Sequence, residues 1–168
     1  PEASWLDLYI GDEVRARLLC TIQDVKPQKM DARTVGLNIY CESLSPWAYS
    51  PLITLDVPVV GSTTLEINNE TDDLYTPVYL KTTYKNANSD FIRIENKTTN
   101  EVTRIEGLAV NEIVTLDGNM MITSDNPNKL FGNSFNFVWP RLNAGVNNFH
   151  IVGNGDVVFE YYYPIKIG

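Results

Sequence analysis

The sequence predicts an all-β fold, and three features of its 168 residues support that prediction. Strand-forming residues dominate, because nine Tyr and six Phe accompany many Val, Ile and Thr. Apolar residues take every second position in short segments, as Val35, Leu37 and Ile39 do. Turn-forming residues separate such segments at intervals of roughly 8 to 12 residues. This pattern favours a β-sandwich over a helical fold, while it leaves a barrel open.

A helix is expected only at the start of the chain, where Trp5, Leu6, Tyr9 and Ile10 fall at helical spacing and Gly11 could end the element. Residues 42–58 hold three prolines and are interpreted as a crossing between two units. Strands are expected at residues 15–22, 34–41, 63–67, 77–84, 91–96, 101–105, 113–116, 120–123, 135–139, 147–152 and 157–165.

Alternation within two of these segments predicts which side chains face the core. Ile92 and Ile94 make one face of their strand apolar, so they are expected to point inward. Phe149 and Ile151 share one face of a later strand, whereas His150 lies on the opposite face. The second half of the chain can therefore supply two facing apolar surfaces, which is what a sandwich core requires.

Charge and composition exclude several classes of function. The formal net charge is -8 and no stripe of Lys and Arg interrupts it, so nucleic-acid binding is not expected. No apolar run approaches the roughly 20 residues that a membrane-spanning helix needs. Cys20 and Cys41 are too few for a disulfide scaffold. They could pair from adjacent strands, but two buried free thiols are the expected state, which fits synthesis in the cytoplasm.

No catalytic, cofactor-binding or metal-binding residue is predicted. The single histidine, His150, has no nucleophile motif with it, and it is interpreted as a half-exposed sheet residue. One His and two distant Cys do not make a zinc site. The densest acidic group lacks the glycine and the closing glutamate of a calcium loop, so it is interpreted as a solvated hairpin loop; its members are Glu66, Glu70, Asp72 and Asp73.

Aromatic residues near the C-terminus suggest the main alternative. Trp139 together with Tyr161, Tyr162 and Tyr163 could form a platform on which sugar rings stack, which would make the chain a carbohydrate-binding sandwich that adheres to a host cell wall. Packing in the core or in an interface is the expected role of these rings. The glycosylation sequons at residues 69–71 and 96–98 carry little weight in a chain without a secretion signal.

Two stretches of the chain resemble the distal tail proteins of long-tailed phages. Residues 37–50 read as an apolar-x-apolar-x-Cys strand, an acidic residue, and then Pro46-Trp47-Ala48-Tyr49-Ser50, a pattern similar to the end of that family's N-terminal domain. Residues 91–147 contain an I-x-N strand, a hairpin, a Leu-Asp-Gly turn and a final L-x-x-G-x-N signal. These resemble the family's C-terminal domain, and the resemblance covers almost the whole chain.

The resemblance implies a structural role. Distal tail proteins form a hexameric ring that joins the tail tube to the tail tip and the receptor-binding apparatus. Residues 1–50 would then be the last, partly helical α+β part of the ring (belt) domain, and residues 51–168 a galectin-like antiparallel β-sandwich. The first part of the ring domain is absent from this sequence, so the chain is expected to be a piece of a longer protein.

The partners implied by the resemblance are further copies of the chain in the ring, the tail tube protein and a tail-tip protein, with the receptor-binding protein as an additional candidate. The expected location is the tail tip of a phage or prophage virion, after synthesis in the cytoplasm of the bacterial host. Ring assembly needs complementary surfaces and sheet edges rather than activated nucleophiles, so no enzymatic activity is expected.

Overall fold

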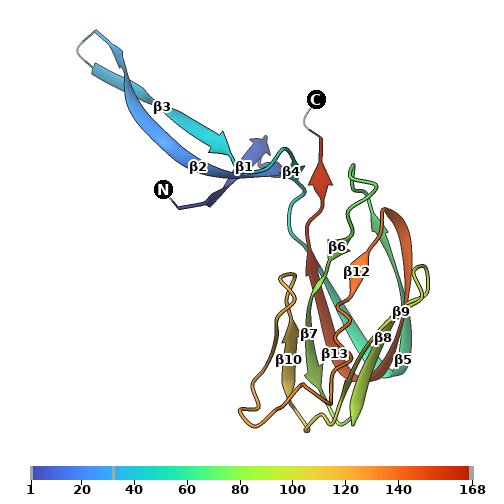
Figure 1. Ribbon diagram of the computed structural model, residues 1–168. Coiled ribbons are helices and arrows are strands. Elements are labelled where there is room, and N and C mark those ends of the chain that lie inside the picture. Colours follow the sequence, from blue (N-terminus) through green and yellow to red (C-terminus); the bar gives the residue numbers. More distant parts are fainter. Residues whose placement is uncertain (1, 32, 167–168) are drawn as a thin grey trace. The chain divides into compact units, whose positions relative to one another are not determined.

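The computed structural model describes residues 2–31 and 33–166, which are built from strands, turns and connecting segments with no helix (Figure 1). The all-β prediction is therefore confirmed. The chain divides into two compact units. The first runs up to Pro51 and includes the segment that begins at Pro164, and the second is Leu52–Tyr163. The assignment of a ring domain to residues 1–50 stays a prediction.

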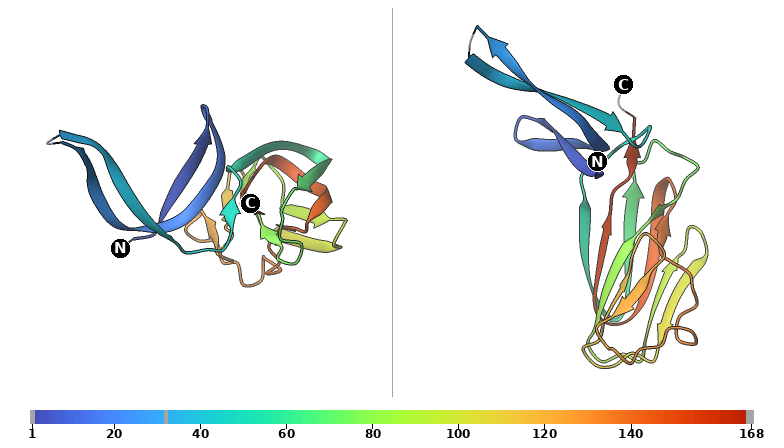
Figure 2. Two further views of the ribbon diagram at one scale, coloured as in Figure 1. Left: turned by 90° about the horizontal axis from the view of Figure 1, so that it is seen from above. Right: turned by 60° about the vertical axis from the view of Figure 1, so that its left-hand side comes forward.

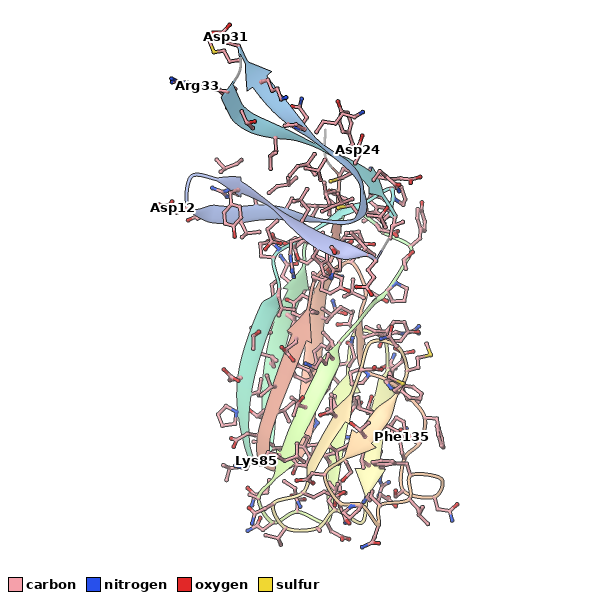
Figure 3. The ribbon with its side chains drawn as sticks, turned by 90° about the vertical axis from the view of Figure 1, so that its left-hand side faces the viewer. Asp12, Asp24, Asp31, Arg33, Lys85 and Phe135 are labelled. Atoms are coloured by element: carbon pink, nitrogen blue, oxygen red, sulfur yellow. The ribbon has the colours of Figure 1, made fainter. Side chains whose placement is uncertain are left out.

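The first unit is a small antiparallel sheet with two extended ribbons. Its strand order is β1-β2-β4-β14, and β3 pairs with β2 beside this path. The strands are β1 (Ser4–Ile10), β2 (Glu13–Met30), β3 (Arg33–Ser43), β4 (Ala48–Tyr49) and β14 (Pro164–Ile165). Figure 3 shows Asp12 at the turn between β1 and β2, and Asp31 and Arg33 at the tip of the β2–β3 ribbon.

The helix predicted for the first ten residues is wrong, because these residues form strand β1. Its backbone pairs with β2 from Ser4 opposite Cys20 to Ile10 opposite Glu13. Gly11, predicted to end a helix, instead takes a positive φ of 65° in the turn between the two strands. A helix of seven residues would be marginal by itself, whereas the long strand β2 offers a partner for every residue of β1.

The second unit is a curled, sandwich-like sheet (Figure 2). Its main sheet has the order β11-β10-β7-β13-β8-β9, with β5 paired to β13, and a small β12-β6 sheet accompanies it. The strands are β5 (Ile53–Asn69), β6 (Val78–Tyr79), β7 (Lys81–Asn86), β8 (Phe91–Asn96), β9 (Glu101–Glu106), β10 (Ile113–Leu116), β11 (Ile122–Ser124), β12 (Arg141–Leu142) and β13 (Gly145–Tyr161).

Two long strands link the two layers of this unit. β5 and β13 pair over 17 residues each. The N-terminal half of β13 also pairs with β8, and its C-terminal half pairs with β7, so the two halves of one strand belong to different layers. Gly61 and Gly153 lie opposite each other where the pair bends, and Gly61 has a φ of 73°.

The core lies between the layers and contains the predicted inward side chains. Ile92, Ile94, Phe149 and Ile151 are all buried, which confirms the alternation. Phe149 and Phe159 come from the two halves of β13, and their ring centroids are 5.8 Å apart. Burial of these apolar side chains is the principal stabilising contribution in this unit.

Three predicted segment boundaries are wrong for identifiable reasons. The crossing expected at residues 42–58 ends early, because β5 begins at Ile53 and includes Pro58 on an edge strand that needs fewer N–H donors. The separate strands at 147–152 and 157–165 form one strand up to Tyr161, which bends at its glycines. Residues 135–139 make only an isolated bridge at Phe135, because Phe137 has a φ of 57°, which no strand accommodates.

Candidate functional site

The β2–β3 ribbon presents an apolar surface to solvent. Residues opposite each other in an antiparallel pair share one face, and three such pairs form a continuous apolar row: Ile22 with Cys41, Val25 with Ile39, and Pro27 with Leu37. Leu37 is 60% exposed and Ile39 is 56% exposed. A two-stranded ribbon with an uncovered apolar row is marginally stable alone, so this row, hereafter the ribbon row, has the character of an interface.

The two cysteines lie near each other at the base of the ribbon row, and both are free thiols. Cys20 is buried opposite Ser43, while Cys41 lies two positions along β3, opposite Ile22. Burial raises the pKa of the Cys20 thiol, and its hydrogen bond with Cys41 acts in the same direction. The expectation that both thiols are buried is wrong for Cys41, because it lies on the exposed row.

His150 occupies the outer face of β13, as the alternation predicts, and it is half-buried there. It lies opposite Thr64 of β5 and Glu95 of β8. Its Nδ1 atom is buried and bonds to no atom among the described residues. No group of His, Cys, Asp and Glu that could hold a metal ion occurs in the described part of the chain. The side chain borders an open hollow of about 510 Å3 over β5 and β13.

Glu95 is the most strongly engaged carboxylate on this outer face. Its Oε2 atom is 2.7 Å from the guanidinium of Arg93, and Lys97 Nζ donates to Oε1 at 2.8 Å. The hydrogen bond from Lys97 lowers the pKa of Glu95, and the charge of Arg93 adds to this effect. Because the carboxylate is held in its charged form, it supports the fold only while it is ionised.

Replacing Glu95 with glutamine is expected to reduce the loss of folding stability that the protein shows as pH falls. A carboxyl with a lowered folded pKa stabilises the fold above its unfolded pKa, and this contribution is lost as pH falls toward the folded value. The difference in melting temperature between wild type and E95Q should therefore shrink between about pH 6 and pH 3. Thermal unfolding followed by circular dichroism measures it, and E106Q on the adjacent strand is the exposed control. A difference that does not change with pH would contradict this role.

The acidic loop between β5 and β6 is held by local hydrogen bonds. Asp73 Oδ1 accepts the backbone N–H groups of Tyr75 at 3.0 Å and Thr76 at 3.2 Å. A hydrogen bond from the side chain of Thr76 is the main cause that lowers the pKa of Asp73, and the backbone bonds act in the same direction. The hydroxyl of Tyr163 donates to Glu70 at 3.4 Å. The acidic group is therefore not the hairpin loop that was predicted: Glu66 lies in strand β5, and the loop that carries the other three residues joins β5, which pairs with β13, to β6, which pairs with β12.

The aromatic residues proposed as a stacking platform lie in separate environments. Trp139 packs edge-on against Phe135, with centroids 5.0 Å apart, and its ring is 6.4 Å from that of Phe137. Tyr161 is buried in the core, and burial raises the pKa of its hydroxyl. Tyr163 packs against the same core. Tyr162 is 39% exposed, whereas the other three rings pack against neighbouring residues, so the four side chains do not form one exposed platform.

Buried asparagines are a feature that sequence reasoning missed. The sequon residues Asn69 and Asn96 are 1% and 3% exposed, so neither amide is accessible to a glycosylating enzyme in the folded chain. Asn96 Nδ2 donates to the backbone of Arg141 and to Asn147 Oδ1. Asn147 is fully buried and closes the turn before β13. The L-x-x-G-x-N pattern, which ends at Asn147, is the sequence signal that could have identified this asparagine as a residue that stabilises the turn.

Comparisons with known proteins place this geometry among phage tail proteins. A family model described as "Phage tail C-terminal domain" matches residues 47–161. The crystal structure of the SPP1 Dit (gp 19.1) protein, described as a paradigm of the hub adsorption apparatus in phages that infect Gram-positive bacteria, matches with a TM-score of 0.57 and 16% identity. The match covers 95% of this chain and 65% of that chain, and at this identity it establishes the fold. No curated protein matches.

Proposed function

Because the chain belongs to the phage tail C-terminal domain family, we propose that it is the distal tail protein that links the tail tube to the tail tip and the receptor-binding apparatus. It is a structural component of a phage tail, and its place is the tail of the virion. The fold predicted from the resemblance to distal tail proteins agrees with the likeness to SPP1 Dit. The hub role rests on that likeness together with the ribbon row.

The ribbon row is the observation that supports self-assembly. Six residues of β2 and β3 form an uncovered apolar face, and such faces in soluble proteins are typically interfaces. Repeated head-to-tail contacts through such a face generate a closed ring when the rotation between copies closes. The proposal is therefore that residues 1–50 belong to a ring-forming domain and that residues 51–168 form its galectin-like sandwich.

The remaining parts of the proposal concern chemistry and partners. The chain acts through surfaces and has no catalytic step, which fits a polar outer face without a nucleophile motif. It needs no cofactor. Its partners are further copies of itself, the tail tube protein and a tail-tip protein, and the receptor-binding protein is an additional one. Synthesis occurs in the host cytoplasm, where the free thiols of Cys20 and Cys41 stay reduced. In the described residues no helix is both long and apolar enough to cross a membrane.

Replacing Leu37 with aspartate is expected to abolish ring formation by the full-length protein. The change places a charge in the Pro27–Leu37 pair of the ribbon row, where an assembled interface would have to desolvate it. Size-exclusion chromatography with light scattering should report a ring for wild type and a monomer for L37D.

Asn38→Asp is the matched control, because Asn38 is exposed on the other face of the same strand, opposite Lys26. N38D should assemble as wild type does. A full-length wild type that stays monomeric over a wide concentration range, or an L37D ring, would refute the proposed role of the row.

A further inference from the structure

The outer face of the second unit carries a hollow with both polar and apolar lining residues, which the hub function leaves without a role. The hollow has a volume of about 510 Å3, within the range typical of small-molecule sites. It lies on the paired strands β5 and β13, beside the start of the turn that follows β8. Its lining residues are Thr64, Leu65, Glu66, Lys97, Asn148, Phe149 and His150.

Four of the lining side chains hold polar groups without a bonding partner. The side chains of Thr64, Glu66, Asn148 and His150 make no hydrogen bond or ion pair to any described residue, and His150 Nδ1 is buried in that condition. Thr64 lies directly opposite His150, and Glu66 lies directly opposite Asn148. The four groups therefore form a two-by-two array with edges of about 5 Å across the strands and 7 Å along them.

The chemistry of this array suits a ligand rich in hydroxyl groups. A carboxylate accepts, an amide and a hydroxyl both donate and accept, and a neutral imidazole does one of each. Hydroxyl groups of a sugar can satisfy all of these roles at once, because each of them donates and accepts. We infer that the hollow binds a neutral saccharide of one or two rings, with Glu66 and Asn148 as the residues that hold its hydroxyl groups.

The charge around the hollow favours a neutral ligand over an ionic one. Lys97 contacts Glu95 at 2.8 Å, and Arg93 contacts the other oxygen of the same carboxylate. Both cations are thus engaged by Glu95, and Glu66 has no cationic partner among the described residues. A phosphate would face an unpaired carboxylate, and a cation would find only one, so neither ion gains net electrostatic attraction from this set.

A second exposed surface of the unit is a poorer candidate for a saccharide site than the hollow on β5 and β13. Met121, Phe137 and Trp139 form an apolar surface, but its polar groups are already engaged, since Trp139 Nε1 donates to Met121 O at 3.4 Å and Asn136 bonds to backbone of β9. That surface offers no free group to orient hydroxyls. The hollow differs in that it combines free polar groups with an apolar lining from Leu65 and Phe149.

The test is a titration of the chain with neutral sugars, followed by the backbone amide signals of an isotope-labelled sample. Glucose, galactose, N-acetylglucosamine and lactose are added in turn up to about 100 mM, which detects dissociation constants in the millimolar range. The expected result is that at least one sugar shifts the amides of residues 64–66 and 148–150. Glu66→Gln and Asn148→Ala should each weaken that binding at least tenfold.

Asp56→Asn is the matched control, because Asp56 is an exposed carboxylate on the outer face of the same strand and lies outside the hollow. It should bind as wild type does. No shift with any of the four sugars, shifts that map elsewhere, or equal affinity in E66Q and D56N would each overturn the inference. Loss of binding to another tail protein in E66Q, without a sugar response, would overturn it in favour of a protein partner. None of these outcomes depends on ring assembly.

Discussion

Replacing Gly155 with alanine is expected to destabilise the second unit by roughly 3 to 5 kcal/mol, among the largest effects that a single methyl group produces. Gly155 lies in β13 with a φ of 151°, a conformation that is essentially restricted to glycine. A Cβ atom there would lie 2.1 Å from the carbonyl oxygen of Lys85 and 3.0 Å from the backbone nitrogen of Ala87. Both contacts are backbone atoms, which no rotamer change can move away.

The position matters because it is where β13 meets the turn after β7. Ala87 N donates to Asn154 O at 2.8 Å, so the strand and the turn are bonded next to the contact. Moving the backbone apart to admit a methyl group would break this bond and disturb the pairing of Gly155 with Asn86. Figure 3 places the neighbouring Lys85 at one end of this unit. Chemical denaturation followed by tryptophan fluorescence gives the free energy of unfolding.

Two glycines supply a graded control series. Gly61 has a φ of 73° but no atom within 4 Å of an added Cβ, so Gly61→Ala should cost about 1 kcal/mol from backbone strain alone. Gly132 has open space and no positive φ, so Gly132→Ala should be nearly neutral. If G155A were no less stable than G61A, the steric argument would be wrong. If G155A fails to fold at all while G61A folds, the argument stands.

The sequence predicted the class of fold because that class depends on a local property. Side-chain alternation with a period of two determines which residues face inward, and Ile92, Ile94, Phe149 and Ile151 follow it. The first strand was misread for a related reason. A helical period fits Trp5, Leu6, Tyr9 and Ile10. These residues nevertheless form a strand because they pair with β2, and pairing between segments is not visible in a short sequence window.

The outer-face hollow lay beyond sequence reasoning for the same physical reason. Glu66 and Asn148 are 82 positions apart along the chain, and only the register between β5 and β13 brings them opposite each other. The sequence did place His150 on an outer face, because this follows from alternation within one strand. For the ribbon row, the alternation of Leu37 and Ile39 predicts that the two side chains share one face of a strand. The sequence does not predict that this face is exposed, because exposure depends on whether another layer covers it.

Replacing Asn147 with aspartate is expected to destabilise the second unit by about 3 to 5 kcal/mol near neutral pH, although the two side chains have nearly the same shape. Asn147 is fully buried and uses all of its bonding capacity. Its Nδ2 donates to Asn143 O at 2.8 Å and Gly145 O at 2.9 Å, and its Oδ1 accepts from Asn143 N and from Asn96 Nδ2. The side chain thus holds the turn before β13 closed, which is why the L-x-x-G-x-N pattern ends in asparagine.

The aspartate variant would place a carboxylate oxygen against two backbone carbonyl oxygens, and neither contact can be satisfied while the group is charged. Burial and these carbonyls would raise the folded pKa of the introduced carboxyl above its unfolded value. Protons therefore bind more tightly to the folded variant, and part of the lost stability should return as pH falls through that raised pKa. Asn148→Asp, one residue along and exposed, should cost at most about 1 kcal/mol, because the new carboxylate only meets repulsion from Glu66 directly opposite it. Equal losses for N147D and N148D, or a loss for N147D that is independent of pH, would show that the side chain of Asn147 does not close the turn.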